Sequence, residues 1–251
     1  MLKNEREREI INLLKSKNGY ATVKDLCETL YVSESSIRRD LSSLEHRGAV
    51  RRTYGGAELV SNFTNAVAFS RRSRHNIAAK KAIAKKAATL VKDGDIIFLD
   101  QSSSAYFLAA ELSANPTLTI VTNNIEIMNL LADSSIKVLS SGGFLFSENR
   151  ACLVGGDAER VFSEMYADLV FFSTKSLSHE GVLSDPTREE VLVRTAMLKN
   201  ARKRIYLCDS EKFGGQSAYK QCDLKDIDVL VTEEEPDSKF ISELAKLTDI
   251  L

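Results

Sequence analysis

The chain has 251 residues and a formal net charge of −1, and 43% of its residues are hydrophobic and 27% charged. These values describe a folded globular protein and exclude a disordered chain. No apolar run approaches the roughly 18 residues of a membrane span, and the N-terminal sequence MLKNEREREI has no apolar stretch of the signal-peptide type. We therefore expect a cytoplasmic protein that does not contact a membrane.

The near-neutral total conceals an uneven distribution of charge. The segment that ends at Lys80 holds 15 Lys+Arg against 9 Asp+Glu, a net charge of +6, and the remainder holds 19 against 26, a net charge of −7. A basic first part beside an acidic body concentrates affinity for nucleic acid in one domain. The length also favours two domains, one of them small.

The cysteines and histidines show no spacing that is typical of a metal site. The cysteines are scattered and indicate reduced thiols in place of a disulfide framework; they are Cys27, Cys152, Cys208 and Cys222. His46, His75 and His179 are equally dispersed. We expect neither a metal nor a cofactor.

Three amphipathic helices are predicted near the N-terminus. The first covers about residues 4–17, the second Thr22–Leu30, and the third runs from a cap at Ser33 to about His46. Their apolar residues recur at helical spacing and should share one small core: Ile10, Ile11, Leu13, Leu14, Val23, Leu26, Cys27, Leu30, Ile37, Leu41 and Leu44. Two short helices joined so tightly, at Tyr31-Val32, predict a helix-turn-helix motif.

The face of the third helix opposite this core is short, polar and cationic. Short hydroxyl side chains let a helix lie deep in the major groove of DNA, and arginine can bind guanine edges or phosphates. A solvated helix face is the alternative for such residues taken alone, but the preceding helix favours DNA binding. The predicted DNA-binding residues of this helix are Ser33, Ser35, Ser36, Arg38, Arg39 and Ser42.

A small basic wing is predicted after the third helix. Gly48 should end that helix as a left-handed cap, Ala49–Tyr54 has the character of a β-strand, and Gly55-Gly56 turns the chain. The predicted DNA contacts of the wing are Arg51, Arg52 and Tyr54. Residues 1–57 should therefore form a winged helix-turn-helix domain that binds double-stranded operator DNA.

Residues 58–75 are polar and small, end in a basic cluster and show no steady period, which is typical of a linker. Between residues 76 and 251, short apolar runs alternate with amphipathic helices. The predicted strands are Ile96–Leu99, Leu118–Val121, Ile136–Leu139, Leu169–Phe172, Ile205–Cys208 and Val229–Val231. The predicted helices are one after Lys80 and Phe107–Leu112, Ile125–Leu131, Ala158–Met165, Glu189–Lys199 and Ser238–Leu247. This alternation predicts an α/β domain with a mainly parallel sheet covered on both faces.

Polar residues follow the predicted strands at their carboxyl ends, where such sheets bind ligands. Each group alone is ordinary turn and capping chemistry, but several groups at one edge favour a ligand site. Hydroxyls, amides, lysines and carboxylates suit a phosphorylated sugar or polyol, with Ser102–Ser104 and Lys212 on the phosphate. The predicted effector-binding residues are Asp100, Ser102, Ser103, Ser104, Thr122, Asn123, Gly142, Gly143, Lys175, Asp209 and Lys212.

An ordered set of residues surrounds the third helix: Ser36-Ile37-Arg38-Arg39-Asp40-Leu41, Leu44-Glu45, Gly48, Arg51 and Gly55-Gly56-Ala57. With this pattern the chain resembles the DeoR family of bacterial transcription regulators. Ser36 stands where the family usually has threonine, so the hydroxyl is kept, and Tyr54 stands where it usually has histidine.

The resemblance continues into the second domain. Its matching stretches are Lys81-Ala82-Ile83-Ala84, Gly94-Asp95, Phe98-Leu99-Asp100, Thr122-Asn123, Gly142-Gly143, Ala196-Met197, Asp209-Ser210 and Lys212-Phe213-Gly214. The domain is similar to the DeoR sensor domain, which resembles the fold of ribose-phosphate isomerase and glucosamine-phosphate deaminase. The family commonly has Asp-Ser-Gly-Thr-Thr-Thr where this chain has Asp100-Gln101-Ser102-Ser103-Ser104-Ala105, so a glycine is missing while hydroxyls remain. The resemblance implies a non-enzymatic repressor of a carbohydrate-catabolism operon that a phosphorylated sugar releases.

Two other functions stay open. One is an active sugar-phosphate isomerase or deaminase with a DNA-binding appendage; its candidate acids and bases, without a compact motif to join them, are Asp100, His179, Glu190 and Asp209. The other is an activator, because the sign of regulation depends on where the operator lies. In each case we expect a homodimer or homotetramer, since a single winged domain contacts too little DNA for an operator. The sequence names neither the sugar nor the operator.

Overall fold

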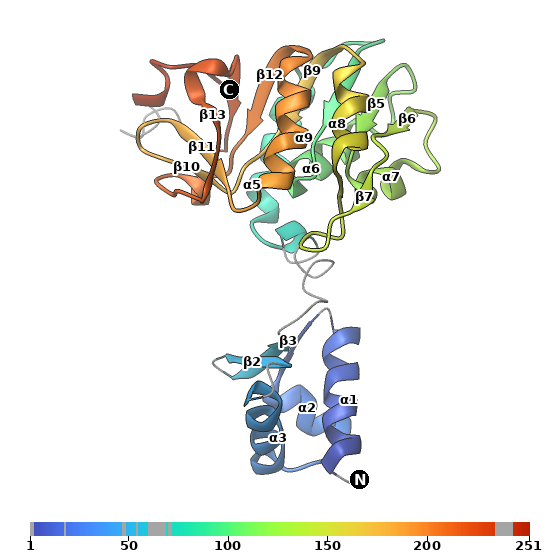
Figure 1. Cartoon of the computed structure of the whole chain (residues 1–251), viewed down its shortest axis with the longest axis vertical. Helices are drawn as coiled ribbons and strands as arrows, with labels where there is room; N and C mark the ends of the chain where they lie inside the picture. The colour runs from blue at the N-terminus through green and yellow to red at the C-terminus, as the bar shows by residue number, and fades with distance from the viewer. Residues whose placement is uncertain are drawn as a thin grey trace. The chain divides into compact units, whose positions relative to one another are not determined.

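The computed structural model describes residues 3–17, 19–46, 49–53, 55–59, 69, 72–233 and 243–251. The chain divides into two compact units (Figure 1), Met1–Arg71 with Ser147–Arg150, and Arg72–Phe146 with Ala151–Leu251. Among the described residues, no helix is long and apolar enough to cross a membrane.

The N-terminal unit is a winged helix-turn-helix, as predicted. Its helices are α1 (Lys3–Ser16), α2 (Val23–Leu30) and α3 (Glu34–His46), and its antiparallel sheet has the order β1 (Tyr20–Thr22), β3 (Gly56–Leu59), β2 (Val50–Thr53). The predicted apolar stripes meet in one core, which includes Ile10, Leu14, Leu26, Ile37 and Leu41. Strand β1 was not predicted, because three residues are too few to show a period of two.

Local hydrogen bonds fix the ends and the packing of these helices. Thr22 Oγ1 accepts a hydrogen bond from the Asp25 amide at 3.0 Å, and Asp25 Oδ2 accepts one from the Thr22 amide at 3.2 Å, so the two residues form a capping box. Asp40 in α3 is 2% exposed, and Arg6 in α1 donates through Nε to its Oδ2 at 2.5 Å. This ion pair ties α1 to α3.

The wing extends further than predicted. Strand β3 runs to Leu59, beyond the boundary expected after Ala57. Gly55 has a φ of +86° and makes the turn, and a Cβ atom on Gly56 would lie 2.4 Å from the Ala21 carbonyl oxygen. Glycine at 56 therefore allows β1 and β3 to pair. Gly48 and Tyr54, for which a cap and a DNA contact were predicted, lie outside the described residues.

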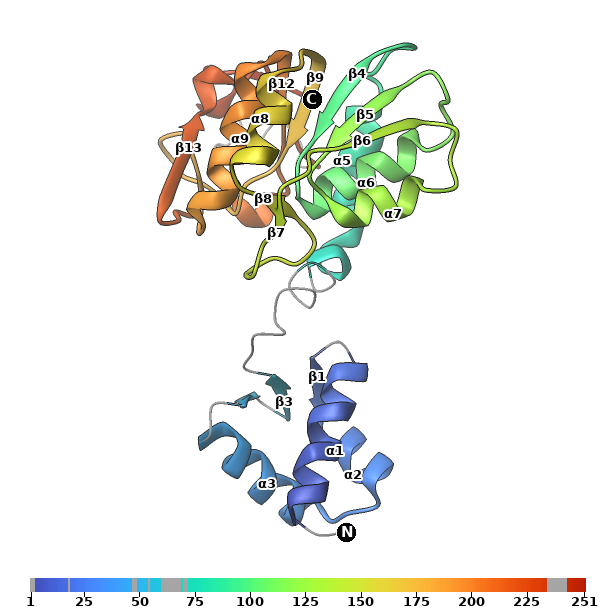
Figure 2. The ribbon, with the colours of Figure 1, turned by 45° about the vertical axis from the view of Figure 1, so that its right-hand side comes forward.

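The second unit is built on a seven-stranded parallel sheet, which confirms the predicted fold class. Its strands, in spatial order, are β15 (Asp249–Ile250), β14 (Val229–Val231), β12 (Ala201–Leu207), β9 (Ala167–Phe172), β4 (Ile96–Leu99), β5 (Thr119–Thr122) and β6 (Lys137–Ser140). One face packs against α5 (Ile77–Ala88), α6 (Ser103–Leu112) and α7 (Ile125–Leu131), and the other against α8 (Gly156–Ser163) and α9 (Arg188–Lys199), as Figure 2 shows.

Alternating side chains of β4 reach the two helical layers. Ile97 and Leu99 belong to the core that includes α5, α6 and α7. Phe98 points to the other layer, where its ring meets the Phe162 ring of α8 edge to face with 5.0 Å between centroids. Because both faces are buried, the strand is a continuous apolar run, the pattern that made it predictable.

The strand order reverses between β4 and β9. The chain adds β5 and β6 on one side of β4, and then returns to add β9, β12, β14 and β15 on the other side. Loops at the carboxyl ends of the two strands diverge at such a switch point, and ligands bind in the crevice between them. Asp100 follows β4 here, and Ser173 follows β9.

Several short elements were not predicted. These are β10 (Ser176–Leu177), β11 (Val182–Asp185) and β13 (Tyr219–Asp223), which form an antiparallel sheet; the hairpin of β7 (Phe144–Leu145) and β8 (Leu153–Val154); β15; and the 3-10 turns η1 (Ser210–Lys212) and η2 (Leu224–Asp226). Half of the helix predicted at Ser238–Leu247 lies outside the described residues; of the other half, residues 243–244 are helical and residues 245–247 form a turn.

Candidate functional site

The outer face of α3 carries the predicted DNA-binding side chains. Ser33, Ser35, Arg38, Arg39 and Ser42 are exposed, and Ser36 is partly buried. The hydroxyl of Ser33 lies 3.2 Å from that of Ser35 and 3.0 Å from that of Ser36. A polar, hydroxyl-rich surface therefore covers the first turn of the helix.

The two arginines of this face are held by weak surface contacts. Arg38 donates to Glu34 Oε1 at 2.8 and 2.6 Å, while Arg39 donates to the Ser35 carbonyl at 3.2 Å and to Ser36 Oγ at 3.4 Å. Exposed contacts of this kind contribute about 1 kcal/mol or less. Both guanidinium groups can therefore exchange them for phosphates or base edges.

The wing joins this surface directly. Arg52 NH1 donates to Ser42 Oγ at 2.7 Å, and its amide donates to Glu45 Oε1 at 2.9 Å. Arg51 is on the same strand, and its NH1 lies 3.5 Å from Glu58 Oε1. The wing and α3 thus present one contiguous basic and polar surface.

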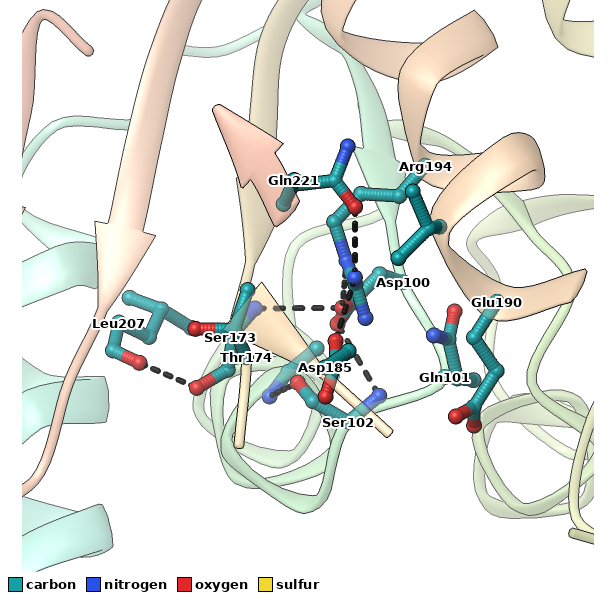
Figure 3. Close-up of polar contacts among 12 residues, drawn as sticks. Asp100, Gln101, Ser102, Ser173, Thr174, Asp185, Glu190, Arg194, Leu207 and Gln221 are labelled. Carbon is teal, nitrogen blue, oxygen red and sulfur yellow. Dashed lines mark hydrogen bonds and ion pairs between the residues drawn. The ribbon is translucent and has the colours of Figure 1, made fainter. Parts of the chain in front are cut away.

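Asp100 organises the carboxyl edge of the large sheet (Figure 3). Its Oδ1 accepts a hydrogen bond from the Ser102 amide at 3.0 Å, and its Oδ2 accepts from the Ser173 amide at 3.2 Å and from Arg194 Nε at 3.0 Å. The side chain is fully buried. One carboxylate therefore spans the switch point between β4 and β9 and fixes the loop that follows β4.

Arg194 connects this carboxylate to the small sheet. Its NH1 donates to Asp185 Oδ2 at 2.6 Å and to Gln221 Oε1 at 2.9 Å, as Figure 3 shows. Burial disfavours its charge, but Asp185 and Asp100 outweigh that effect and hold the pKa of the guanidinium above its ordinary value. Arg194 therefore remains a cation within the protein interior.

The serine loop opens helix α6. Ser102 caps the helix, because its Oγ accepts a hydrogen bond from the Ala105 amide at 3.0 Å. Ser103 and Ser104 occupy the first turn and are 5% and 1% exposed. The amides of a first helical turn have no partner within the helix, so this end attracts anions.

Thr122 and Asn123 follow β5 beside this loop. Thr122 Oγ1 donates to the Leu99 carbonyl at 2.7 Å and accepts from the Asn124 amide at 3.0 Å. Asn123 Nδ2 donates to the Leu153 carbonyl at 3.0 Å and to Gln101 Oε1 at 3.3 Å. Thr122 thus closes the end of β5, and Asn123 faces the loop after β4.

Lys212 approaches the same edge from the far side of β9. Its Nζ donates to Ser173 Oγ at 2.5 Å and lies 3.3 Å from Asp209 Oδ2. Lys80 in α5 is 4% exposed, and burial lowers the pKa of its amine to about 8. Burial alone would raise the pKa of Asp209, but the charges of Lys212 and Lys80 outweigh it and hold the value below the ordinary one.

The comparisons with known proteins identify the chain. Residues 6–63 match the DeoR-like helix-turn-helix domain, and residues 75–234 match the DeoR C terminal sensor domain. The chain belongs to the DeoR family. It is therefore a DNA-binding transcription regulator with a C-terminal sensor domain.

Several DeoR-type relatives match almost end to end. The HTH-type transcriptional regulator GolR of Listeria innocua is 36% identical over 91% of this chain and 90% of its own. The HTH-type transcriptional repressor GlcR of Bacillus subtilis is 32% identical, over 96% and 92%. The lactose phosphotransferase system repressor of Staphylococcus aureus is 30% identical, over 95% of each chain. Among solved structures, ribose 5-phosphate isomerase A of Methanocaldococcus jannaschii aligns with a TM-score of 0.40 and 20% identity over 53% of each chain.

Three predicted effector residues of this DeoR regulator are placed differently from the rest. Gly142 and Gly143 follow the edge strand β6 and are exposed. A Cβ atom on Gly143 would lie 2.5 Å from the Val154 carbonyl oxygen, so close packing requires a glycine at this position. The Lys175 side chain is exposed, and its amide donates to Asp185 Oδ1 at 2.9 Å. These three residues are not part of the series of contacts that joins Ser102, Asp100, Ser173 and Lys212.

Sequence reasoning missed four residues at this edge of the DeoR sensor domain: Lys80, Gln101, Asp185 and Arg194. Lys80 and Arg194 carried a recognisable signal, because each is a charge among apolar neighbours of its helix, such as Ile83 and Val193. Asp185 ends a four-residue strand that shows no period.

Proposed function

We propose that this DeoR-family chain represses a carbohydrate-catabolism operon and is released from its operator by a phosphorylated sugar bound at the carboxyl edge of the large sheet. The observation that carries the proposal is the series of contacts from Lys212 through Ser173 and Asp100 to Ser102. It links a partly buried cation to the N-terminus of α6 across the switch point of the sheet.

The proposed phosphate site combines this cation with the first turn of α6. Ser102 uses its hydroxyl for the cap, so the donors for a phosphate are the first-turn amides and the hydroxyl of Ser103. Lys212 adds a full charge, which strengthens each hydrogen bond to a phosphate oxygen. Asp100 positions this loop, because its two oxygens already accept hydrogen bonds from three protein donors.

The names of the relatives support a repressor of sugar metabolism. GlcR is named a transcriptional repressor, and the Staphylococcus aureus relative is named the repressor of a lactose phosphotransferase system. We infer the same sign of regulation and a phosphorylated sugar as effector for this chain. We also infer a sensor that does not turn its ligand over, because Asp100 is engaged by Arg194 and two amides and holds no position for abstracting a substrate proton.

For the DNA-binding unit, we infer that Arg39 reads base edges while Arg51 and Arg52 bind phosphates. Arg39 lies on the exposed face of α3 among short hydroxyl side chains. Arg52 of the wing joins this face through Ser42, and Arg51 is exposed on the same strand beside Glu58. One winged domain contacts few base pairs, so we infer a homodimer or homotetramer on a palindromic operator. Sedimentation that shows one chain per operator duplex would contradict this assembly.

Two measurements test the proposed function together. Sequencing of the DNA fragments that the protein binds should show a palindromic site beside genes of sugar uptake or breakdown. Calorimetry should then show binding of the phosphorylated sugar of that pathway, and weaker binding of its unphosphorylated parent. A bound site without such genes, or equal affinity for the parent sugar, would contradict the proposal.

A further inference from the structure

Three fully buried polar atoms at the carboxyl edge of the sheet have no hydrogen-bond partner within the described residues. They are Gln101 Nε2, Ser104 Oγ and Asn123 Oδ1. The residues that carry them are 1%, 1% and 0% exposed. A buried polar group without a partner lowers the stability of the folded state, so such groups are rare in proteins unless water or a ligand completes them.

The three atoms come from two adjacent strand ends. Gln101 and Ser104 follow β4, and Asn123 follows β5, which pairs with β4 through Leu99 and Thr122. Gln101 and Asn123 are hydrogen-bonded to each other, since Asn123 Nδ2 donates to Gln101 Oε1 at 3.3 Å. Gln101 and Asn123 therefore form one hydrogen-bonded pair with two unused atoms, and Ser104 follows Gln101 by three residues in the first turn of α6.

The orientation of both amide groups is set by the backbone. Asn123 Nδ2 donates to the Leu153 carbonyl at 3.0 Å, and a carbonyl oxygen can only accept. The nitrogen of Asn123 must therefore face Leu153 and Gln101, which leaves Asn123 Oδ1 as an unused acceptor. Gln101 must then present its oxygen to Asn123, which leaves Gln101 Nε2 as an unused donor.

This pairing of a donor and an acceptor selects the chemistry of the ligand. A phosphate oxygen accepts hydrogen bonds, so it suits Gln101 Nε2 but is repelled by Asn123 Oδ1. A hydroxyl accepts and donates at once and satisfies both atoms. Ser104 Oγ can serve either role for a second hydroxyl. We propose that Gln101, Asn123 and Ser104 form a subsite for the hydroxyls of the sugar part of the effector, separate from the phosphate site at Lys212.

The inference rests on the proposed function, because it assigns the sugar end of the same ligand. It also accounts for a feature of this chain, the glutamine and serine at 101 and 102 in place of the serine and glycine usual in the family. A glutamine side chain at 101 is long enough to bond Asn123 through one polar atom and to present a second polar atom to a ligand. A serine at 101 is shorter and has a single polar atom, so it cannot do both.

The test compares apolar variants at the subsite with matched controls, by thermal unfolding and calorimetry on the full chain. The variants are Gln101→Met and Ser104→Ala. The controls are Ser113→Ala at the other end of α6, whose hydroxyl donates to Ala110 O, and Asn200→Ala, whose Nδ2 donates to Ala196 O. The probes are inorganic phosphate, glucose 6-phosphate, fructose 1-phosphate, fructose 6-phosphate, ribose 5-phosphate and, for the tightest of these, its monodeoxy analogues.

We expect both subsite variants to melt no lower than wild type without ligand, because Ser104 loses no hydrogen bond and Gln101 loses one long one. Each should bind the tightest sugar phosphate at least tenfold more weakly and lose its preference over one deoxy analogue. Affinity for inorganic phosphate should not change. The controls should melt slightly lower than wild type and bind all probes normally.

Unchanged sugar-phosphate affinity and unchanged deoxy discrimination in Gln101→Met and Ser104→Ala would overturn the inference and assign the cluster to bound water, with the phosphate site intact. The same conclusion follows if wild type binds inorganic phosphate but none of the sugar phosphates. If wild type binds no probe at all, the proposed function fails first. Should Gln101→Met fold poorly, Ser104→Ala decides alone.

Discussion

Arg194 in α9 and Asp100 at the end of β4 form an ion pair of 3.0 Å whose side chains are 2% and 0% exposed. The same guanidinium lies 2.6 Å from Asp185 at the end of β11. One buried cation therefore holds together the serine loop, the small antiparallel sheet and α9. Both buried carboxylates depend on this one guanidinium for their counter-charge.

We expect Arg194→Met to lower the free energy of unfolding by about 3–5 kcal/mol, because it leaves two buried carboxylates without their partner. Arg160→Met is the control, because Arg160 pairs with Asp157 at 3.4 Å on the surface. This substitution should lower the free energy of unfolding by less than about 1 kcal/mol. Chemical denaturation of both variants measures the difference. Equal losses would show that the Arg194 ion pairs do not stabilise the unit.

The two arginines of the DNA-binding surface should behave differently. Arg39→Ala should weaken binding to the preferred site by about 1–3 kcal/mol and relax its base preference, whereas Arg52→Ala should weaken binding to all DNA and reduce the salt slope by about one. Titrations on operator and random DNA at several salt concentrations separate the two effects, with Lys225→Ala in the α/β unit as control. If Arg39→Ala weakens both DNAs equally, Arg39 is not a base reader.

Lys80 should make stability depend on pH in the alkaline range. Its pKa falls from 10.5 to about 8 through burial. Below pH 8 the amine is charged in the folded and the unfolded chain; between pH 8 and 10.5 only the unfolded chain binds the proton, so stability rises with pH. Relative to Lys80→Met, the free energy of unfolding of wild type should rise by about 1.4 kcal/mol per pH unit across this window.

Denaturation of wild type, Lys80→Met and the exposed control Lys81→Met between pH 7 and about 10 tests this slope. The rise in stability should be absent in Lys80→Met and present in Lys81→Met. A rise of equal size in Lys80→Met would mean that the buried amine is not its source.

Tyr31 ends α2 in the left-handed region, with φ of 55° and 94% of its surface exposed. This conformation costs a residue with a Cβ atom roughly 1–2 kcal/mol, and asparagine tolerates it better. We expect Tyr31→Asn to raise the free energy of unfolding by about 0.5–1 kcal/mol. Tyr166→Asn is the control, because Tyr166 is 82% exposed with a negative φ and should gain nothing. The prediction is wrong if Tyr31→Asn is destabilising.

The elements that the sequence predicted well are those whose pattern arises from burial. The run Ile96–Leu99 is β4 with identical bounds, and Ile125–Leu131 is α7 with identical bounds. Both are bounded by polar turn or cap residues, which end the pattern sharply. Strands of two to five residues in the small sheet, such as Val182–Asp185, are too short to show a period and depend on contacts with Tyr219–Asp223 far along the chain.

The candidate site was predictable only in part, for a related reason. Asp100, Ser102 and Lys212 follow strands, so their common edge follows from the fold. Arg194 and Lys80 lie within helices, and no local rule states that their side chains reach the same edge. Gly143 shows the reverse: it follows a strand, as the predicted site residues do, but glycine is required there because a side chain would collide with Val154.

The proposed release of the operator depends on a phosphorylated sugar bound near Lys212. Its most direct test is fluorescence anisotropy of operator DNA with wild type, Lys212→Ala and the exposed control Lys220→Ala, each with the effector and with its unphosphorylated parent. For wild type and Lys220→Ala, the phosphorylated sugar should raise the Kd for the operator by about 5–150-fold, and the operator should raise the Kd for the sugar by the same factor. The parent should have no effect, and Lys212→Ala should bind the operator normally without responding. A normal response from Lys212→Ala, or an equal response to the unphosphorylated sugar, would contradict the claim.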